Sequence, residues 1–203
     1  METGAVKFQY ECSGKELIPF LGFEELNAAR QELRRLNLIG VDENGLGFGN
    51  VSLREETSGS FYITGSGTGA LPVLTLRDYA KVVAWDFERN WLRCEGCTVA
   101  SAESLTHAAV YAMAADARVV VHGHNPGLWR SLIGRGLTTA ADVPYGTPEM
   151  ALEVQRLLRE TAVRTSGIFA MAGHDEGIVV FGQDFSQALG VLAAARASRD
   201  PKN

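Results

Sequence analysis

RVVVHGH, residues 118–124, is the most informative segment of this chain. Its β-branched residues predict a buried strand over 118–122, and the segment closes with His122 and His124, separated by one glycine. Side chains at positions i and i+2 of a strand project from the same face, so both imidazoles can reach one ion about 2 Å from each ring nitrogen. Gly123 avoids crowding between the two rings. The spacing therefore indicates a candidate metal site.

His174 is the third candidate ligand, and it follows a strand-like segment over 168–172. Three histidines leave a coordination position open for substrate or water, which favours Lewis-acid chemistry. The alternative is structural, with a strand-end pair that hydrogen-bonds to backbone and a polar histidine in a turn. An H-x-H pair by itself does not decide between these interpretations.

Glu103 is a candidate acid–base residue on the segment that precedes the histidine strand. Ser101 can cap a helix reaching about Ala114, which places Glu103 in the first turn and His107 four residues later on the same face. The helix dipole alone can explain a carboxylate at this position. Beside a divalent cation, however, a carboxylate can move a proton to or from a carbon whose neighbouring oxygens the metal binds. We expect His107 to have a supporting or structural role.

The remaining segments alternate between helical and extended patterns. Leu26, Ala29 and Leu33 have helical spacing, and turn-rich residues 57–60 between two extended segments predict a hairpin. Hairpins argue against a purely parallel sheet. The expected helices are 23–36, a short one begun at Thr75, 101–114, 147–158 and one capped by Asp184, and the expected strands are 51–54, 61–64, 82–87, 91–94, 118–122, 168–172 and 178–181.

Length and charge limit the class of protein. The chain has 203 residues, of which 46% are hydrophobic and 21% charged, and no linker or repeat interrupts it, so we expect a single domain over residues 1–203. Nineteen Lys and Arg against 24 Asp and Glu give a net charge of −5, which argues against a broad nucleic-acid surface. No apolar run approaches the roughly 20 residues of a membrane-spanning helix. We expect neither nucleic acid nor membrane as a partner.

The cysteine content and the first residues of the chain favour a cytoplasmic location for the protein. Cys12, Cys94 and Cys97 cannot all pair, and METGAVKFQYE lacks the apolar core of a secretory leader, so we expect reduced thiols. The Cys94 and Cys97 pair has no second C-x-x-C with which to form a zinc knuckle. We interpret it as structural or incidental.

GSGTGA, residues 65–70, is a competing motif that fits the G-x-G-x-x-A pattern of dinucleotide sites, with Asp86 about 20 residues further on. Such a site needs a helix that opens directly on the pyrophosphate. Pro72 and the apolar residues up to Leu74 delay any helix, and the preceding hairpin is not a βαβ unit. We therefore do not favour nucleotide binding.

Several motifs occur together in an order that resembles the class II aldolase/adducin family, and the resemblance covers most of the chain. This family includes fuculose-phosphate and rhamnulose-phosphate aldolases, ribulose-phosphate epimerases, methylthioribulose-phosphate dehydratases and the non-enzymatic adducin head domain. The matching motifs are Gly49-Asn50-Val51-Ser52, Ile63-Thr64-Gly65-Ser66-Gly67, Glu103 with His107, His122-Gly123-His124, Tyr145-Gly146-Thr147-Pro148-Glu149, and His174 before a glycine-bounded strand.

The resemblance implies an α/β fold and a set of site residues. The fold is a three-layer α/β/α arrangement with a central mixed, largely antiparallel sheet flanked by helices. By resemblance, the zinc ligands are His122, His124 and His174, the acid–base residue is Glu103, and the substrate-binding or phosphate-loop residues are Gly49, Asn50, Ser66, Gly67 and Ser101.

The implied activity is that of a zinc-dependent lyase of carbohydrate metabolism, an aldolase that acts on a ketose or ketose phosphate through a metal-stabilised enediolate. The family resemblance also implies a homotetramer, and another divalent transition metal could take the place of zinc. Epimerisation or dehydration of a sugar phosphate would use the same enediolate chemistry. An adducin-head-like interaction domain would keep the fold without chemistry, but the presence of all three histidines and Glu103 favours the enzyme.

The sequence departs from the family pattern at several positions. Gly47 and Phe48 stand where the aldolases' phosphate loop often has a hydroxyl residue and a small residue, which leaves fewer hydroxyl donors for a phosphate. The His-Gly of the family is replaced by His174-Asp175-Glu176-Gly177, which adds two acids near the third ligand. No tyrosine of segment 134–145 matches the catalytic tyrosine of the fuculose-phosphate aldolases, so the second acid–base residue stays unassigned.

Overall fold

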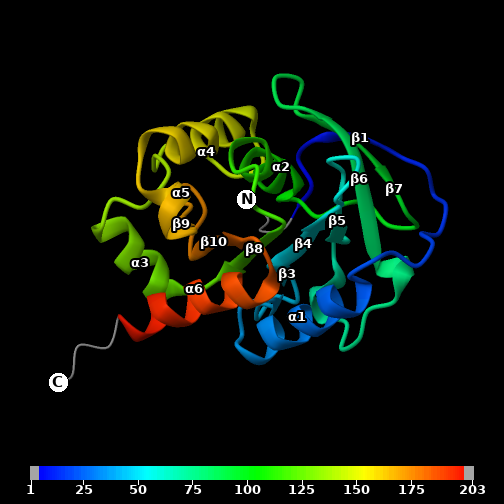
Figure 1. Ribbon diagram of the computed structural model, residues 1–203, viewed down its shortest axis with the longest axis horizontal. Helices are drawn as coiled ribbons and strands as arrows, with labels where there is room; N and C mark the ends of the chain where they lie inside the picture. Colours follow the sequence, from blue (N-terminus) through cyan, green and yellow to red (C-terminus); the bar gives the residue numbers. More distant parts are fainter. Residues whose placement is uncertain (1–4, 199–203) are drawn as a thin grey trace.

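An eight-stranded sheet forms the centre of the computed structural model of the chain, which describes residues 5–198 (Figure 1). All neighbouring strands pair antiparallel except at one edge, where β1 runs parallel to β7. This confirms the expected mixed, largely antiparallel sheet. Across the sheet the strands are β1 (Gln9–Cys12), β7 (Trp91–Glu95), β6 (Tyr79–Asp86), β5 (Phe61–Thr64), β4 (Asn50–Arg54), β8 (Val119–His124), β10 (Gly177–Gly182) and β9 (Ile168–Ala170).

Helices cover both faces of this sheet, which confirms the three-layer α/β/α fold. Figure 1 shows α2 and α4 on one side and α1 and α6 on the other, and packing places α5 with the first pair and α3 with the second. A separate two-stranded ribbon joins β2 (Gly40–Val41) to β3 (Gly47–Phe48). The helices are α1 (Phe23–Arg35), α2 (Ser104–Met113), α3 (Pro126–Gly134), α4 (Pro148–Glu160), α5 (Val163–Ser166) and α6 (Phe185–Ala197), with 3-10 helices η1 (Thr68–Ala70) and η2 (Leu76–Asp78).

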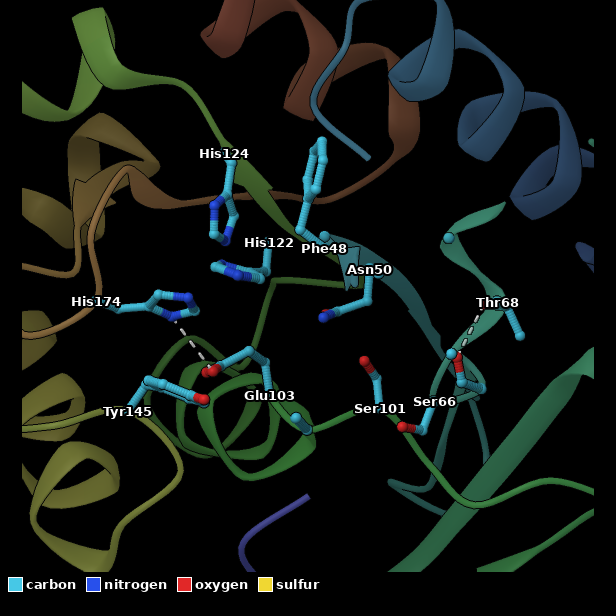
Figure 2. Close-up of a pocket in the computed structure, with 16 residues that line it drawn as sticks. Phe48, Asn50, Ser66, Thr68, Ser101, Glu103, His122, His124, Tyr145 and His174 are labelled. Atoms are coloured by element: carbon cyan, nitrogen blue, oxygen red, sulfur yellow. Dashed lines mark hydrogen bonds and ion pairs between the residues drawn. The ribbon is translucent and has the colours of Figure 1, made fainter. Parts of the chain in front are cut away.

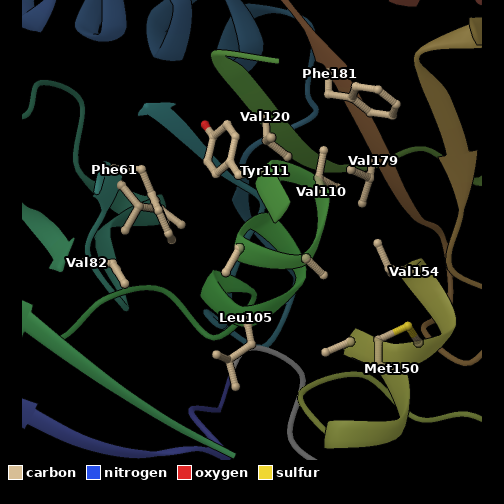
Figure 3. Close-up of a cluster of buried hydrophobic side chains, with 14 of the residues drawn as sticks. Phe61, Val82, Leu105, Val110, Tyr111, Val120, Met150, Val154, Val179 and Phe181 are labelled. Carbon is tan, nitrogen blue, oxygen red and sulfur yellow. The ribbon is translucent and has the colours of Figure 1, made fainter. Parts of the chain in front are cut away.

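Strand alternation divides the buried side chains into two clusters, one on each face of the sheet. In β8, Val119 and Val121 pack against the layer of α1, α3 and α6, while Val120 packs against the layer of α2 and α4. Figure 3 shows the second of these clusters, in which Val120 lies beside Tyr111 of α2. Because side chains two apart share a face, His122 faces the same layer as Val120, toward α2.

The helix starts follow the predicted capping residues. Thr147 accepts a hydrogen bond from the Met150 amide, and Asp184 accepts one from the Gln187 amide. Pro148 occupies the first turn of α4, where a missing amide hydrogen costs nothing. The predicted caps of α4 and α6 are therefore confirmed, and Thr75 with Asp78 forms the capping box of η2.

The start of α2 differs from the prediction. The helix begins at Ser104, and its N-cap is Glu103 rather than Ser101, so Glu103 lies just before the first turn and not within it. Both the amide and the hydroxyl of Ser104 donate to the Ser101 carbonyl, at 3.0 and 2.6 Å. This local turn uses the Ser101 backbone to redirect the chain and leaves the helix to open two residues later.

Several strand boundaries also differ from the prediction. The β8 strand continues past 122 to His124, because His124 pairs with Gly177 of β10 and so extends the ladder. The β9 strand stops at Ala170 instead of residue 172, where the chain enters the turn that carries His174. The edge strand β1 and the helices α3 and α5 were not predicted. Three of the four β1 residues are exposed, so the sequence has no alternation of apolar and polar residues from which this strand could be predicted.

The competing dinucleotide motif does not have the geometry that it requires. The β5 strand leads into η1, which is only three residues long, and β5 pairs antiparallel with β6. A dinucleotide site needs a βαβ unit with parallel strands and a full helix directly after the glycine-rich turn.

Over residues 5–198, no helix combines the length and apolar character needed to cross a membrane.

The α4 helix provides a matched pair of leucines that tests the packing of the α2 and α4 layer. Leu157 is 1% exposed in the core, whereas Leu152 on the same helix is 53% exposed. We expect Leu157→Ala to lower the free energy of unfolding by about 2–5 kcal/mol, because it leaves a cavity. Leu152→Ala should change it by no more than about 0.5 kcal/mol. Urea denaturation measures both, and equal losses in the two variants would contradict this packing.

Candidate metal centre and pocket

Three imidazoles converge at the end of β8. His122, His124 and His174 have ring centroids 4.8–5.2 Å apart, and one nitrogen from each lies within 4.8 Å of the others (Figure 2). They are the one metal-capable cluster of His, Cys, Asp and Glu found in the described part of the chain. The spatial convergence expected from the H-x-H spacing and His174 is therefore present.

Strand register explains how a residue 50 positions away reaches the H-x-H pair. His124 pairs with Gly177 and His122 with Val179, so the turn before β10 is held at the end of β8. His174 occupies that turn, and its carbonyl accepts the Gly177 amide at 3.0 Å. A Cβ at Gly177 would lie 3.1 Å from the His174 ring and 3.2 Å from that of His122, so the glycine makes room for both rings.

The tautomer of His122 suits a ligand. Its Nδ1 lies 3.2 Å from the Ile178 carbonyl oxygen, which can only accept, so Nδ1 carries the hydrogen. The Nε2 lone pair is then available. Metal-bound histidines commonly donate their second ring N–H to a backbone carbonyl, which fixes the ring orientation.

Burial keeps the H-x-H rings neutral. It lowers the pKa of His122 well below its usual value, and it lowers the pKa of His124 to about 4, with the neighbouring imidazoles contributing in the same direction. Neutral imidazole is the form that binds a metal ion. At neutral pH His122 and His124 therefore present lone pairs rather than positive charges.

Glu103 brings a negative charge to the same place. Its side chain is 2% exposed, its Oε2 accepts a hydrogen bond from the Thr106 hydroxyl at 2.7 Å, and its Oε1 lies 3.5 Å from Nδ1 of His174. Burial alone raises the pKa of this carboxyl, but the His174 and His122 imidazoles and the Thr106 hydroxyl outweigh burial and lower it to about 2. The carboxylate is thus ionised beside the imidazoles.

Buried polar atoms at this place lack partners in the described part of the chain and fit a bound cation. Glu103 Oε1 and both ring nitrogens of His174 are buried without a hydrogen-bond partner among the described residues. A buried polar atom without a partner is costly, so native proteins seldom keep three of them together. A divalent ion bound by the three imidazoles would satisfy His174 and compensate the charge of Glu103, so the residues present fit a metal.

His107 has the structural surroundings that we expected. It is fully buried, and its Nδ1 lies 2.7 Å from the Ser52 hydroxyl, which also lies 2.7 Å from the Tyr111 hydroxyl. Burial lowers the pKa of His107 to about 3, although Glu103 acts in the opposite direction. This hydrogen-bonded chain ties α2 to β4 and so holds Glu103 at the sheet.

A pocket adjoins the imidazoles and contains every predicted substrate-binding residue. Asn50 of β4 is 4% exposed and pairs in register with His122, which sets its side chain beside the cluster (Figure 2). Residues 65–72 are here called the glycine loop, and residues 65–69 of this loop form the other wall. The pocket is lined by Gly47, Phe48, Gly49, Asn50, Gly65, Ser66, Gly67, Thr68, Gly69, Ser101, Ala102, Glu103, His122, His124, Tyr145 and His174.

Backbone approach explains why glycine is needed at Gly49. Its φ is +74°, and a Cβ there would lie 2.5 Å from the Leu38 carbonyl oxygen.

Phe48, the bulky residue in this segment, packs its ring near His124, with ring centroids 5.2 Å apart, and lies close to Gly40. Figure 2 shows the Phe48 ring directed away from Asn50, so it borders the imidazoles and does not fill the space beside Asn50.

Sequence reasoning missed two residues at this site. The Tyr145 ring stacks on His174 with centroids 4.3 Å apart, and Lys7 Nζ lies 3.3 Å above the centre of the same ring. Lys7 also donates to the Tyr145 carbonyl at 3.0 Å. The sequence indicated Tyr145 only as part of the Tyr-Gly-Thr-Pro motif, with no sign of its contact with His174. No sequence feature indicated that Lys7 reaches the site, because Lys7 lies 138 positions away from Tyr145.

The cysteines lie away from this centre. Cys12 and Cys94 are register partners in β1 and β7, and all three cysteines are free thiols. Burial raises the pKa of Cys94 to about 12, so its thiol stays protonated. A structural role for Cys94 is consistent with these surroundings.

Comparison with known families gives the relationship of this chain. The class II aldolase and adducin N-terminal domain matches over residues 33–198. The chain belongs to this family. No curated protein matches.

Solved structures with the same fold include several aldolases of this family. An L-fuculose 1-phosphate aldolase aligns with a TM-score of 0.65 and 19% identity, covering 87% of this chain and 82% of that one. The L-fuculose-1-phosphate aldolase from Thermus thermophilus gives 0.60 and 24%, covering 87% and 90%. YgbL from Escherichia coli, a putative aldolase/epimerase/decarboxylase, gives 0.62 and 21%, covering 87% and 85%. These likenesses show the fold of the class II aldolases.

The stack of Tyr145 on His174 can be tested through metal affinity. Tyr145→Phe keeps the aromatic face, and we expect it to bind zinc as tightly as the wild type. Tyr145→Ala removes the face that orients His174, so we expect roughly tenfold weaker binding, the size typical of losing a group that orients a ligand. Competition with a chromophoric chelator measures both affinities. Equal affinity in all three proteins would show that the stack does not orient the ring.

The buried neutral state of His107 predicts a pH dependence of stability. In the unfolded chain its pKa is 6.5, whereas in the folded chain it is about 3. Between these values the unfolded chain binds more protons, so this residue contributes stability above pH 6.5 that is lost as the pH falls toward 3. We expect the free energy of unfolding of His107→Gln to fall less over this interval than that of the wild type. Parallel curves from urea denaturation would refute this prediction.

Proposed function

We propose that this protein is a metal-dependent class II aldolase-like lyase that cleaves a ketose or ketose phosphate. One observation carries the proposal: three imidazoles, of which His122 and His174 are buried and His124 half-buried, gather beside the ionised carboxylate of Glu103 on the wall of a pocket. This arrangement leaves buried atoms without partners, which costs stability. Family members that act only as interaction domains have no need of such a cluster.

We further propose that His122, His124 and His174 hold a divalent transition metal, with zinc as the first candidate. Three neutral nitrogen ligands are the donor set of zinc sites that keep an open position. When bound, the ion supplies Lewis-acid stabilisation of the negative charge that develops on substrate oxygens. The hydrogen bond between His122 Nδ1 and the Ile178 carbonyl would hold one ligand in the required tautomer.

Glu103 is our candidate for moving the proton. In aldol cleavage, the hydroxyl next to the breaking C–C bond loses its proton, and the electron pair of that bond passes to the carbon beside the carbonyl. That carbon then takes a proton to give the ketone product. Glu103 is the described carboxylate that lies against the imidazoles, and Thr106 fixes its other oxygen. As a carboxylate, it is placed to take up the proton that the hydroxyl releases and then to deliver it to that carbon, so that no net proton is gained or lost.

The substrate would lie along the pocket between the imidazoles and the glycine loop. Gly49 and Asn50 supply a backbone turn and an amide beside His122. Asn50 Oδ1 is buried without a described partner, so a substrate hydroxyl can donate to it. Figure 2 shows Ser66 and Ser101 at the end of the pocket away from His174, and Gly67, which also lines the pocket, follows Ser66 in the chain. Their hydroxyl and amide donors suit the far end of the substrate.

Other reactions of the family remain the alternatives. Epimerisation or dehydration of a sugar phosphate would use the same imidazoles and the same carboxylate, and the structure of YgbL carries the description putative aldolase/epimerase/decarboxylase. Product analysis separates these reactions. Aldol cleavage yields two carbonyl compounds, epimerisation yields an isomer of the substrate, and dehydration yields a product that has lost one molecule of water.

We also propose that the protein is a cytoplasmic homotetramer. Light scattering would measure the mass of the assembly.

Metal analysis tests the cluster directly. We expect wild-type protein to retain one divalent ion per chain after dialysis, and we expect His122→Ala and His174→Ala to lose it, because each removes one of three ligands. His107→Gln is the matched control, since it alters the fourth histidine, which lies outside the cluster, and should keep the ion. Inductively coupled plasma mass spectrometry measures the metal content. Retention of the ion by both alanine variants would overturn the metal assignment.

Glu103 is tested by separating metal binding from turnover. Glu103→Gln keeps the shape of the side chain but cannot accept the proton, so we expect full metal content with turnover lowered by about 10²–10⁴-fold on any ketose or ketose phosphate that the wild type cleaves. Glu149→Gln is the control, because Glu149 is an exposed carboxylate at the start of α4. Unchanged turnover in Glu103→Gln would remove the acid–base assignment.

A further inference from the structure

Lys7 reaches the candidate metal centre, although the proposed mechanism does not use it. It is half-buried, and it precedes residue 33, where the match to the family begins. Its Nζ lies 3.3 Å from the centre of the Tyr145 ring and donates to the Tyr145 carbonyl oxygen at 3.0 Å. One lysine thus contacts both the aromatic face and the backbone of the same tyrosine.

The Tyr145 ring lies between Lys7 and His174. The imidazole of His174 stacks on it, with ring centroids 4.3 Å apart and 28° between the ring planes (Figure 2). An ammonium group and an imidazole at these distances from one ring centre would overlap if they shared a face, so they occupy opposite faces. Lys7 therefore blocks the direction in which the tyrosine ring would move away from His174.

His174 needs such a support more than His122 does. The His122 ring is held by the hydrogen bond from its Nδ1 to the Ile178 carbonyl. Both ring nitrogens of His174 lack a hydrogen-bond partner among the described residues, and Glu103 Oε1 at 3.5 Å from Nδ1 is too distant for a good hydrogen bond. Packing must therefore orient this ring, and the stack on Tyr145 is its shortest aromatic contact.

Asn90 anchors the backbone that carries Lys7. Its Nδ2 donates to the Lys7 carbonyl at 3.1 Å and to the Gly146 carbonyl at 3.3 Å. Its own carbonyl accepts the Gln9 amide at 2.8 Å, at the start of β1. One side-chain amide thus ties the segment before β1 to the peptide that follows Tyr145.

Packing further restricts this segment. Phe8 is 5% exposed in the core of the α2 and α4 layer, and Val6 packs against the same core. Gly146 has a φ of +71°, and a Cβ there would lie 3.1 Å from Lys7 Cδ, so the glycine leaves room for the lysine stem. The backbone on both sides of the contact between Lys7 and Tyr145 is therefore held in place.

The charges at the site suit a cation on the tyrosine face. Burial lowers the pKa of the Lys7 ammonium, while the negative charge of Glu103 acts in the opposite direction and favours the charged form. The face of an aromatic ring carries partial negative charge and attracts a cation placed over its centre. The contact is therefore attractive as well as steric.

We propose that Lys7 is a positioning residue that holds Tyr145 against His174 and so fixes the orientation of the third metal ligand. The support comes from a segment distant in the chain, which Asn90 and Phe8 fasten to the edge of the site. This inference rests on the proposed function for its metal, and it adds a residue that contacts neither the metal ligands nor the proposed substrate-binding residues in any interaction described above.

Zinc affinity, measured by competition with a chromophoric chelator, tests this role. Lys7→Met keeps the aliphatic stem but removes the charge and the donor, so we expect about threefold weaker binding, the size of a partly exposed cation–π contact. Lys7→Arg keeps a cation and donors, and it should bind zinc as the wild type does. Lys15→Met is the matched control, since it removes an exposed lysine from the same end of the chain and should leave the affinity unchanged.

A double-mutant cycle shows whether Lys7 acts through the tyrosine ring. In Tyr145→Ala the ring that links Lys7 to His174 is absent, so adding Lys7→Met should weaken zinc binding no further. In Tyr145→Phe the aromatic face remains, so adding Lys7→Met should again weaken binding about threefold. A lysine that supported the fold in general would instead weaken binding equally in both backgrounds.

Hydrogen exchange in the metal-free protein gives a readout that depends on neither metal nor turnover. The turn that carries His174 is closed by hydrogen bonds from the His174 amide to the Met171 carbonyl and from the Gly177 amide to the His174 carbonyl, both at 3.0 Å. We expect amides of this turn to exchange about threefold faster in Lys7→Met than in the wild type or Lys7→Arg, because the stacked ring is less restrained. Exchange in α6, in the opposite layer, should not change.

Several results would overturn the proposal. They are wild-type zinc affinity in folded Lys7→Met, an equal loss in Lys15→Met, no recovery in Lys7→Arg, a further loss when Lys7→Met is added to Tyr145→Ala, and unchanged exchange of the His174 turn in Lys7→Met. Circular dichroism establishes folding for each variant, and Lys7→Gln replaces Lys7→Met if the latter does not fold.

Failure of the proposed function would look different. A protein that binds zinc but cleaves no ketose would contradict the lyase assignment and leave the affinity and exchange tests of Lys7 in force. A wild type that binds no zinc would overturn the metal assignment, and Lys7 would then be judged by hydrogen exchange, in which faster exchange in Lys7→Met supports its hold on the turn and unchanged exchange refutes it.

Discussion

The antiparallel register between β8 and β10 is the constraint on which the site depends. It pairs His124 with Gly177 and so holds the preceding turn, with His174, against the H-x-H pair. A shift of one residue would turn every side chain of β8 to the opposite face and direct His122 away from α2. The register is itself set by burial, because the valines of β8 must face two different cores, one on each side of the sheet.

Burial then determines the charges at the site. The same low exposure that keeps His122 and His124 neutral would also favour a neutral Glu103, but the neighbouring imidazoles and Thr106 outweigh it. The result is one negative charge beside the neutral imidazoles of His122 and His124, with several buried atoms left unpaired. An arrangement of this kind is unfavourable for a purely structural core and suited to an ion. The Ser52, His107 and Tyr111 hydrogen bonds hold α2, and with it Glu103, in this position.

The α1 layer acts on the pocket from the other side of the sheet. Its contribution is Arg30, which reaches two carbonyls of the glycine loop, while β2 closes against Gly69. The two ends of the pocket thus depend on different layers, with the imidazoles and Glu103 held by β8, β10 and α2, and the loop held by α1 and β2. The two ends of the pocket can therefore be altered by separate substitutions, because they rest on separate supports.

Local sequence determined the helices that begin at strong capping residues and the valine-rich strand whose side chains alternate between the two cores. It also placed the His122 and His124 side chains on one face of that strand, because side chains two residues apart share a face. It also carried the family motifs that singled out His174, Glu103 and the glycine loop. Only the tertiary structure decided that Glu103 lies before α2 rather than in its first turn, since that depends on how Ser104 bonds to Ser101. It alone placed Lys7 over Tyr145 and Arg30 under the glycine loop. Such contacts join residues distant in the chain, and no local propensity or periodicity specifies them, because they arise when separately folded layers pack together.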